Sequence, residues 1–164
     1  MAAFSLALGA CSGGDDATDA DKANHYAPAD APPTAKERPV VLEPLVYADY
    51  ENRLDAGLSC NFTSSDGRNL FAASAPDDSA AKGKGLVKVN GDFRTLRTDR
   101  VGGYALLREG ASFHSGGISA SIQRASGEGR REGVESTVWP ASLHVAIEDG
   151  RDVSYDGGRW SCGA

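Results

Sequence analysis

LVKVNGDFR, residues 86–94, is the stretch of this 164-residue sequence that predicts the fold most clearly. Asn90 and Gly91 accept the positive φ angles of a two-residue type I′ turn, and runs with alternating apolar residues flank them on both sides. The stretch therefore predicts two antiparallel strands that form a tight hairpin. Working outward, further short runs bounded by turn residues continue in both directions, which is typical of an all-β domain.

The other strands are predicted from the same alternation of apolar and polar residues. In the run 142–148, Leu143, Val145 and Ile147 are expected to face the core and His144 to face solvent. Turns are expected at Asp66-Gly67, Gly102-Gly103, Gly116-Gly117, Asp149-Gly150 and Asp156-Gly157. The expected strands are Leu58–Thr63, Asn69–Ala73, Gly85–Val89, Phe93–Thr98, Gly103–Arg108, Ser112–Phe113 with its continuation, Ile118–Arg124, Ser142–Glu148 and Val153–Cys162. We expect a mainly β fold, a small antiparallel β-barrel or curled sandwich of about seven or eight strands.

Two cysteines bracket this domain almost from end to end. Cys60 lies in the first expected strand and Cys162 in the last, without the CxxC spacing of a metal site. In an exported protein such a pair predicts a disulfide, which would make the end strands neighbours. Trp160 is two residues before Cys162 and is expected on the same face of the strand. A metal site is the weaker interpretation because no histidine is near either cysteine in sequence.

The N-terminus carries a processing motif. Leu8-Gly9-Ala10-Cys11 follows the apolar run Ala2–Leu8 and resembles the lipobox of bacterial lipoproteins. The resemblance implies cleavage before Cys11 and lipidation of its thiol, and several acyl chains together give stable anchoring. No Lys or Arg precedes Lys22, so we expect a signal peptide shortened at its N-terminus. The alternative is an apolar N-terminus with a chance cysteine.

The chain is expected to consist of four segments. These are a signal peptide at 1–10, lipidated Cys11 with a disordered acidic tether at 11–38, a short helix or brace at 39–57, and an all-β domain at 58–164. Ser12 follows the cysteine where aspartate would mark inner-membrane retention, so the resemblance favours the outer membrane, with the domain in the periplasm. Pro44 and Gly57 delimit the expected helix. Its apolar face is expected to contain Val46, Tyr47, Tyr50 and Leu54.

Charge separates the tether region from the domain. Residues 12–57 carry 10 acidic and 4 basic side chains, whereas residues 58–164 carry 13 of each. The domain thus has no basic excess, which argues against nucleic acid as a partner. We expect a membrane contact through the anchor, a protein partner in the envelope, and a monomer.

The sequence offers candidate binding residues but no catalytic constellation. His114, Ser115, Gly116 and Gly117 form one turn region, and Trp139 precedes an expected strand. We treat these five as candidate binding residues, although each tryptophan is also expected to fill the core. No GxSxG, HExxH or phosphate-binding glycine loop occurs, so we expect no catalytic residues, no metal and no cofactor.

These features favour a non-enzymatic envelope lipoprotein with a binding or structural β domain. Trp139-Pro140 and the Trp160–Cys162 ending resemble uncharacterised lipoproteins of alphaproteobacteria. In architecture the chain also resembles the C-type lysozyme inhibitors, and Ser115-Gly116-Gly117 would correspond to their inhibitory loop, although their Tyr and Trp-Lys-Gly features are missing. Two further alternatives are a cell-wall enzyme that uses His114 and a carrier of a small molecule or lipid inside the barrel.

Overall fold

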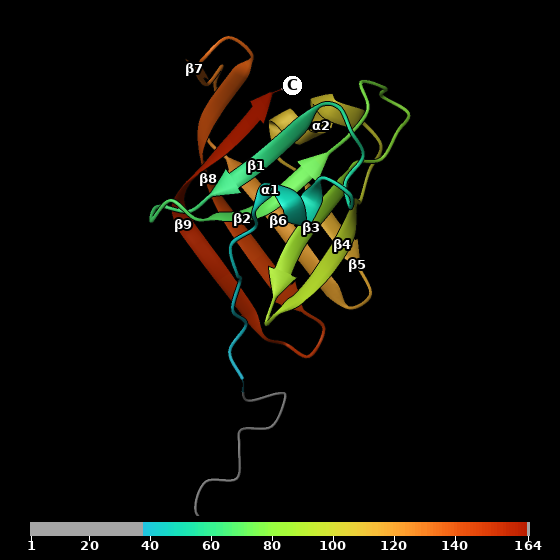
Figure 1. Cartoon of the computed structure of the whole chain (residues 1–164), viewed down its shortest axis with the longest axis vertical. Helices are drawn as coiled ribbons and strands as arrows, with labels where there is room; N and C mark the ends of the chain where they lie inside the picture. Colours follow the sequence, from blue (N-terminus) through green and yellow to red (C-terminus); the bar gives the residue numbers. More distant parts are fainter. Residues whose placement is uncertain (1–37, 164) are drawn as a thin grey trace, which may run out of the picture. The chain divides into compact units, whose positions relative to one another are not determined.

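The computed structural model describes residues 38–163. The predicted signal peptide, Cys11 and nearly all of the predicted tether lie outside the described residues. Eight strands close into an antiparallel barrel in the order β1-β2-β3-β4-β5-β6-β8-β9, and β9 returns to β1 (Figure 1). The bounds are β1 Ser59–Thr63, β2 Asn69–Ser74, β3 Lys84–Val89, β4 Asp92–Thr98, β5 Ser112–Ser115, β6 Ile118–Arg124, β8 Ser136–Ile147 and β9 Asp152–Gly163. The predicted mainly β barrel is confirmed.

The hairpin at Asn90-Gly91 forms as its sequence predicts. The φ angles of Asn90 and Gly91 are 49° and 89°, and Val89 of β3 is opposite Asp92 of β4. Asn90 is the only described residue other than glycine with a positive φ, which fits the tolerance of asparagine for this conformation. The turn therefore sets the register of the β3–β4 pair.

Side chains fill the middle of the barrel. Gly85 makes room for them, because a Cβ atom there would lie 2.5 Å from the ring of Phe71. The aromatic residues whose side chains are fully buried in this interior are Phe62, Phe71, Phe113 and Trp160. A carrier would hold its ligand in the space that these rings occupy, so the middle of the barrel leaves no room for an enclosed lipid.

The Cys60–Cys162 disulfide joins the first strand of the barrel to the last, as predicted. The two cysteines are opposite each other in the β1–β9 pair, with their Cα atoms 4.1 Å apart. Both are buried, and Trp160 shares their interior face. The Trp160 indole N–H donates a hydrogen bond of 2.7 Å to the carbonyl of Leu107.

One predicted strand is wrong. Residues 103–108 belong to helix α2, Gly103–Glu109, which lies over the end of the barrel opposite the Asn90-Gly91 turn (Figure 1). Leu106 and Leu107 are both buried, which suits adjacent positions on a helix that covers a barrel end better than an alternating strand. The residues Ala-Leu-Leu-Arg-Glu also favour helix intrinsically.

The turn predicted at Asp156-Gly157 is wrong as well. These residues lie within β9, where the register with β8 shifts between Ala141 and Leu143 and leaves the extra residues as a bulge. The short strand β7, Arg130–Glu132, pairs with the start of β8 and was not expected.

The N-terminal segment first lies in the wall of the barrel beside β3 and then crosses to its outer face. Leu42 forms a bridge with Val89 and is fully buried in the main core. Helix α1, Tyr47–Tyr50, is a single turn that lies in front of β2 and β3 (Figure 1). Leu45, Ala72 and Leu86 form a second, smaller buried cluster, with Tyr50, Leu54 and Phe93 packed against it.

Two residues of the predicted apolar helix face are exposed. Val46 and Tyr47 are 61% and 68% exposed, whereas Tyr50 and Leu54 pack as expected. The helix is too short to present a continuous apolar stripe, and Leu45, just before it, makes the buried contact instead.

Candidate functional site

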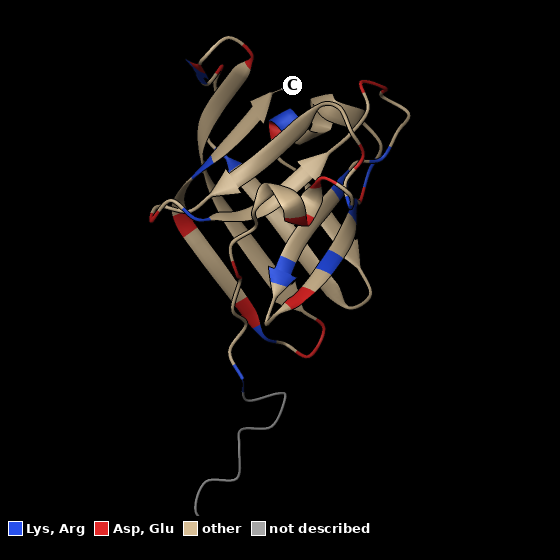
Figure 2. Cartoon of the chain, in the orientation of Figure 1, with Lys and Arg blue, Asp and Glu red and all other residues tan. Residues whose placement is uncertain are grey.

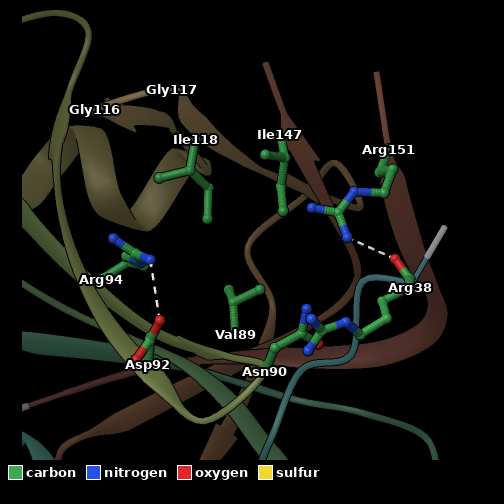
Figure 3. Close-up of a pocket in the computed structure, with 10 residues that line it drawn as sticks. All are labelled: Arg38, Val89, Asn90, Asp92, Arg94, Gly116, Gly117, Ile118, Ile147 and Arg151. Carbon is green, nitrogen blue, oxygen red and sulfur yellow. Dashed lines mark hydrogen bonds and ion pairs between the residues drawn. The ribbon is translucent and has the colours of Figure 1, made fainter. Parts of the chain in front are cut away.

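Three hairpin turns meet at the end of the barrel opposite α2 and surround a hollow of about 390 Å³ (Figure 3). The turns join β3 to β4, β5 to β6, and β8 to β9. We call this hollow the barrel mouth. It is lined by Arg38, Val89, Asn90, Asp92, Arg94, Gly116, Gly117, Ile118, Ile147 and Arg151.

The floor of the barrel mouth is apolar. Val89, Ile118 and Ile147 occupy inward positions at the ends of β3, β6 and β8. Ile118 and Ile147 are opposite each other in the β6–β8 pair. Val89 and Ile118 are 6% and 8% exposed, so the floor of the mouth is the outermost layer of the packed barrel interior.

Three arginines surround this floor. Arg94 is on the same face of β4 as the buried Leu96 and Thr98, so strand alternation directs it toward the mouth. One of its terminal nitrogens lies 3.2 Å from Asp92, and the Arg94 side chain is 53% exposed. Figure 3 shows Arg94 and Arg38 on different sides of the mouth.

Arg151 has most of its donors engaged. Its Nε and Nη2 atoms lie 2.9 and 2.8 Å from one oxygen of Asp149, and Nη1 donates a 2.6 Å hydrogen bond to the carbonyl of Arg38. Asp149 raises the pKa of Arg151 above its ordinary value. Arg151 therefore binds the N-terminal segment to the rim of the mouth through the carbonyl of Arg38.

Arg38 has a different environment. Within residues 38–163, no carboxylate forms an ion pair with its guanidinium. Asp92 pairs with Arg94, and Asp149 pairs with Arg151. These three arginines and two aspartates together therefore carry a net charge of +1. In the view of Figure 2, acidic and basic residues are interspersed over the barrel.

The five predicted binding residues lie at three places. Gly116 and Gly117 line the barrel mouth, and His114 and Ser115 line an adjacent groove of about 380 Å³ on the outer side of the same turn. Trp139 is elsewhere and only 2% exposed; its indole N–H donates a 3.0 Å hydrogen bond to the carbonyl of Gly127. Arg108 and Arg124 lie over its ring, and the ring borders a separate hollow of about 510 Å³ together with Arg130, Pro140 and Arg159.

The histidines lie on the outside of the barrel. His114 Nδ1 contacts a carboxylate oxygen of Asp99, and these side chains are 62% and 48% exposed. His144 faces solvent as predicted, with Nε2 3.2 Å from Asp152. In the described part of the chain, no serine or cysteine side chain is hydrogen-bonded to His114, so the exposed His–Asp pair has no attached nucleophile.

The barrel mouth presents guanidinium donors around an apolar surface. Among the described residues, no group of three His, Cys, Asp or Glu side chains is placed to hold a metal ion. None of the helices in residues 38–163 has the length and apolar character needed to cross a membrane. Arg38, Arg94 and Arg151 were missed by sequence reasoning, although strand alternation around Leu96 already pointed to Arg94.

Comparison of the chain with protein-family models, curated proteins and solved structures found no match in any of the three. The site's own chemistry therefore carries the functional argument.

Proposed function

We propose that this chain is a lipid-anchored protein of the bacterial cell envelope whose β-barrel is a non-enzymatic binding domain. The observation that carries the proposal is the barrel mouth, a hollow with an apolar floor and a rim of guanidinium groups at one end of the barrel. Binding sites commonly combine an apolar surface with a few polar groups that fix orientation. The interior below the mouth is packed, so the ligand contacts the end of the barrel.

Two features support the envelope location. Leu8-Gly9-Ala10-Cys11 matches the lipobox pattern, and Ser12 favours the outer membrane. The buried Cys60–Cys162 disulfide suits an oxidising compartment such as the periplasm. Arg38 lines the mouth, so a lipid anchor at Cys11 would be connected to the barrel at its binding end.

The anchor is tested by labelling cells with a radioactive or clickable fatty acid. We expect label on the wild-type chain and none on Cys11→Ser. A wild-type chain that stays unlabelled would remove the anchor and the envelope placement that depends on it.

The binding domain is tested by affinity capture from envelope extracts with the full chain carrying Cys11→Ser. The matched variant is Arg94→Gln, and the control is Arg97→Gln three residues along the same strand, which faces outward. We expect a partner or ligand that is retained by the control and lost from Arg94→Gln. Identical recoveries from all three chains would contradict a binding role for the mouth.

A second candidate function is inhibition of a lysozyme, and the turn at residues 115–117 favours it. Ser115, Gly116 and Gly117 are exposed, and a Cβ atom on Gly116 would meet nothing within 4 Å. The turn is therefore accessible to a partner. The test is the rate of cell-wall lysis by a C-type lysozyme with and without the Cys11→Ser chain; no inhibition at micromolar concentration would dismiss this function.

A further inference from the structure

We infer that the barrel mouth binds a small organic anion, a carboxylate or phosphate attached to a short apolar stem. The inference rests on the proposed binding function and specifies its ligand class. Arg38 and Arg94 would hold the anion, Arg151 would position Arg38, and the apolar floor would hold the stem.

The charge of the mouth selects an anion. A guanidinium group stays protonated at every physiological pH and presents a planar set of donors that matches a carboxylate or phosphate. Arg38 has no ion-pair partner within residues 38–163, and Arg94 contacts Asp92 through one terminal nitrogen at 3.2 Å. Both side chains therefore keep donors for a ligand, whereas Arg151 uses three nitrogens within the protein.

The floor of the mouth selects an apolar stem. Val89, Ile118 and Ile147 come from three different strands and lie between Arg94 on one side and Arg38 and Arg151 on the other (Figure 3). A hollow of about 390 Å³ is at the lower end of the range for small-molecule sites. It suits an anion with a few carbon atoms, and the packed rings below prevent a longer chain from threading into the barrel.

The direct test is a nuclear magnetic resonance titration of the full chain carrying Cys11→Ser with hexyl phosphate. We expect shifts in the amide signals of Val89, Gly117 and Ile118. Inorganic phosphate and neutral hexanol should each bind more weakly than hexyl phosphate. Across ethyl, butyl and hexyl phosphate, affinity should rise by up to about fourfold for each buried CH₂ group.

Single substitutions then measure the contribution of each arginine to the affinity. Arg38→Gln and Arg94→Gln should each lower the affinity for hexyl phosphate by about five- to tenfold, because each removes a charged hydrogen bond at a partly exposed site. Arg97→Gln removes the same charge from the outer face of β4 and should leave the affinity unchanged. Equal affinity in Arg94→Gln and wild type, or no binding of hexyl phosphate at millimolar concentration, would overturn the inference.

The bound anion could belong to a soluble metabolite or to a lipid headgroup, and sedimentation with phospholipid vesicles distinguishes the two. If the Cys11→Ser chain sediments with phosphatidylglycerol vesicles, but not with phosphatidylcholine vesicles, and Arg94→Gln does not, the anion is a lipid headgroup. If hexyl phosphate binds and neither vesicle does, it is soluble. Fatty-acid labelling of Cys11 and envelope capture are independent readouts, so a failure of the hexyl phosphate titration alone overturns only the ligand class.

Discussion

The disulfide between Cys60 and Cys162 should be the largest single contribution to stability that can be removed without disturbing the core. The change is the double substitution Cys60→Ala and Cys162→Ala, which keeps small apolar side chains at buried positions. The bridge closes a loop with a sequence separation of 102 residues. In the chain-entropy model a loop of this length stabilises the fold by about 4.7 kcal/mol, because it restricts the unfolded chain.

The assay is urea unfolding of the Cys11→Ser chain, followed by tryptophan fluorescence. For a domain of this size, a loss of about 4.7 kcal/mol moves the midpoint by about 2 M urea. The matched comparison is the oxidised chain against the same chain in reductant, which removes the bridge without substitution. Since β1 and β9 also pair through their backbones, both forms should still give a barrel. A loss below about 1 kcal/mol in both comparisons would refute the reasoning.

Three further predictions concern the core and the surface. Trp160→Phe should cost about 1–3 kcal/mol, measured by urea unfolding, because it leaves part of the buried indole volume unfilled and removes the 2.7 Å hydrogen bond to the carbonyl of Leu107, which then keeps only the 3.1 Å bond from the Gly110 N–H; a cost near zero would contradict this. Gly85→Ala should cost about 1–3 kcal/mol in the same assay, since its methyl group overlaps a core ring; unchanged or higher stability would show that the ring moves freely. The hydrogen bond from Lys88 lowers the pKa of Glu43 below its ordinary 4.5, so this pair stabilises the fold above that pH and the contribution is lost as pH falls through the lowered pKa. Glu43→Gln should therefore reduce the acid-dependent loss of unfolding free energy in melts from about pH 6 to 3, and identical profiles would contradict the assignment.

Most of the barrel could be predicted because each strand has one face in the core. The alternation in residues 118–122 and 142–148 identified which side chains point inward, and Asn90-Gly91 set a register that the structure confirms. The order of strands around the barrel follows from antiparallel hairpins together with one bridge between the ends.

Helix α2 could not be predicted from apolar spacing, because a run of seven residues is compatible with either a strand or two helical turns. Gly103, the first residue of the helix, is packed closely against another segment: with φ at 53°, a Cβ atom there would lie 2.3 Å from the carbonyl oxygen of Asp78. That close approach is a tertiary contact that a single sequence does not reveal.

The barrel mouth could not be predicted from the sequence for a related reason. Arg38, Arg94 and Arg151 are far apart in sequence and become neighbours only when the barrel closes and the N-terminal segment lies beside β3. The prediction did identify the turn at 116–117 that completes this rim, because paired glycines stand out in any sequence. Scattered arginines in a neutral domain give no such signal until the strands are assigned to a closed sheet.

The bridge between the end strands also determines how the molecule responds to mechanical load. If tension is applied between Arg38 and Gly163, force passes from β1 to β9 through the Cys60–Cys162 bond and bypasses the intervening chain. Only the stretch from Arg38 to Cys60 can then lengthen, to an end-to-end distance of about 80 Å. The hydrogen bond from Arg151 to the carbonyl of Arg38 would rupture first, followed by those that join residues 41–43 to β3 and its turn. Under this load, the segment from residue 38 to residue 60 would detach from the barrel. Residues 60–162, which the disulfide closes into a loop, would not extend.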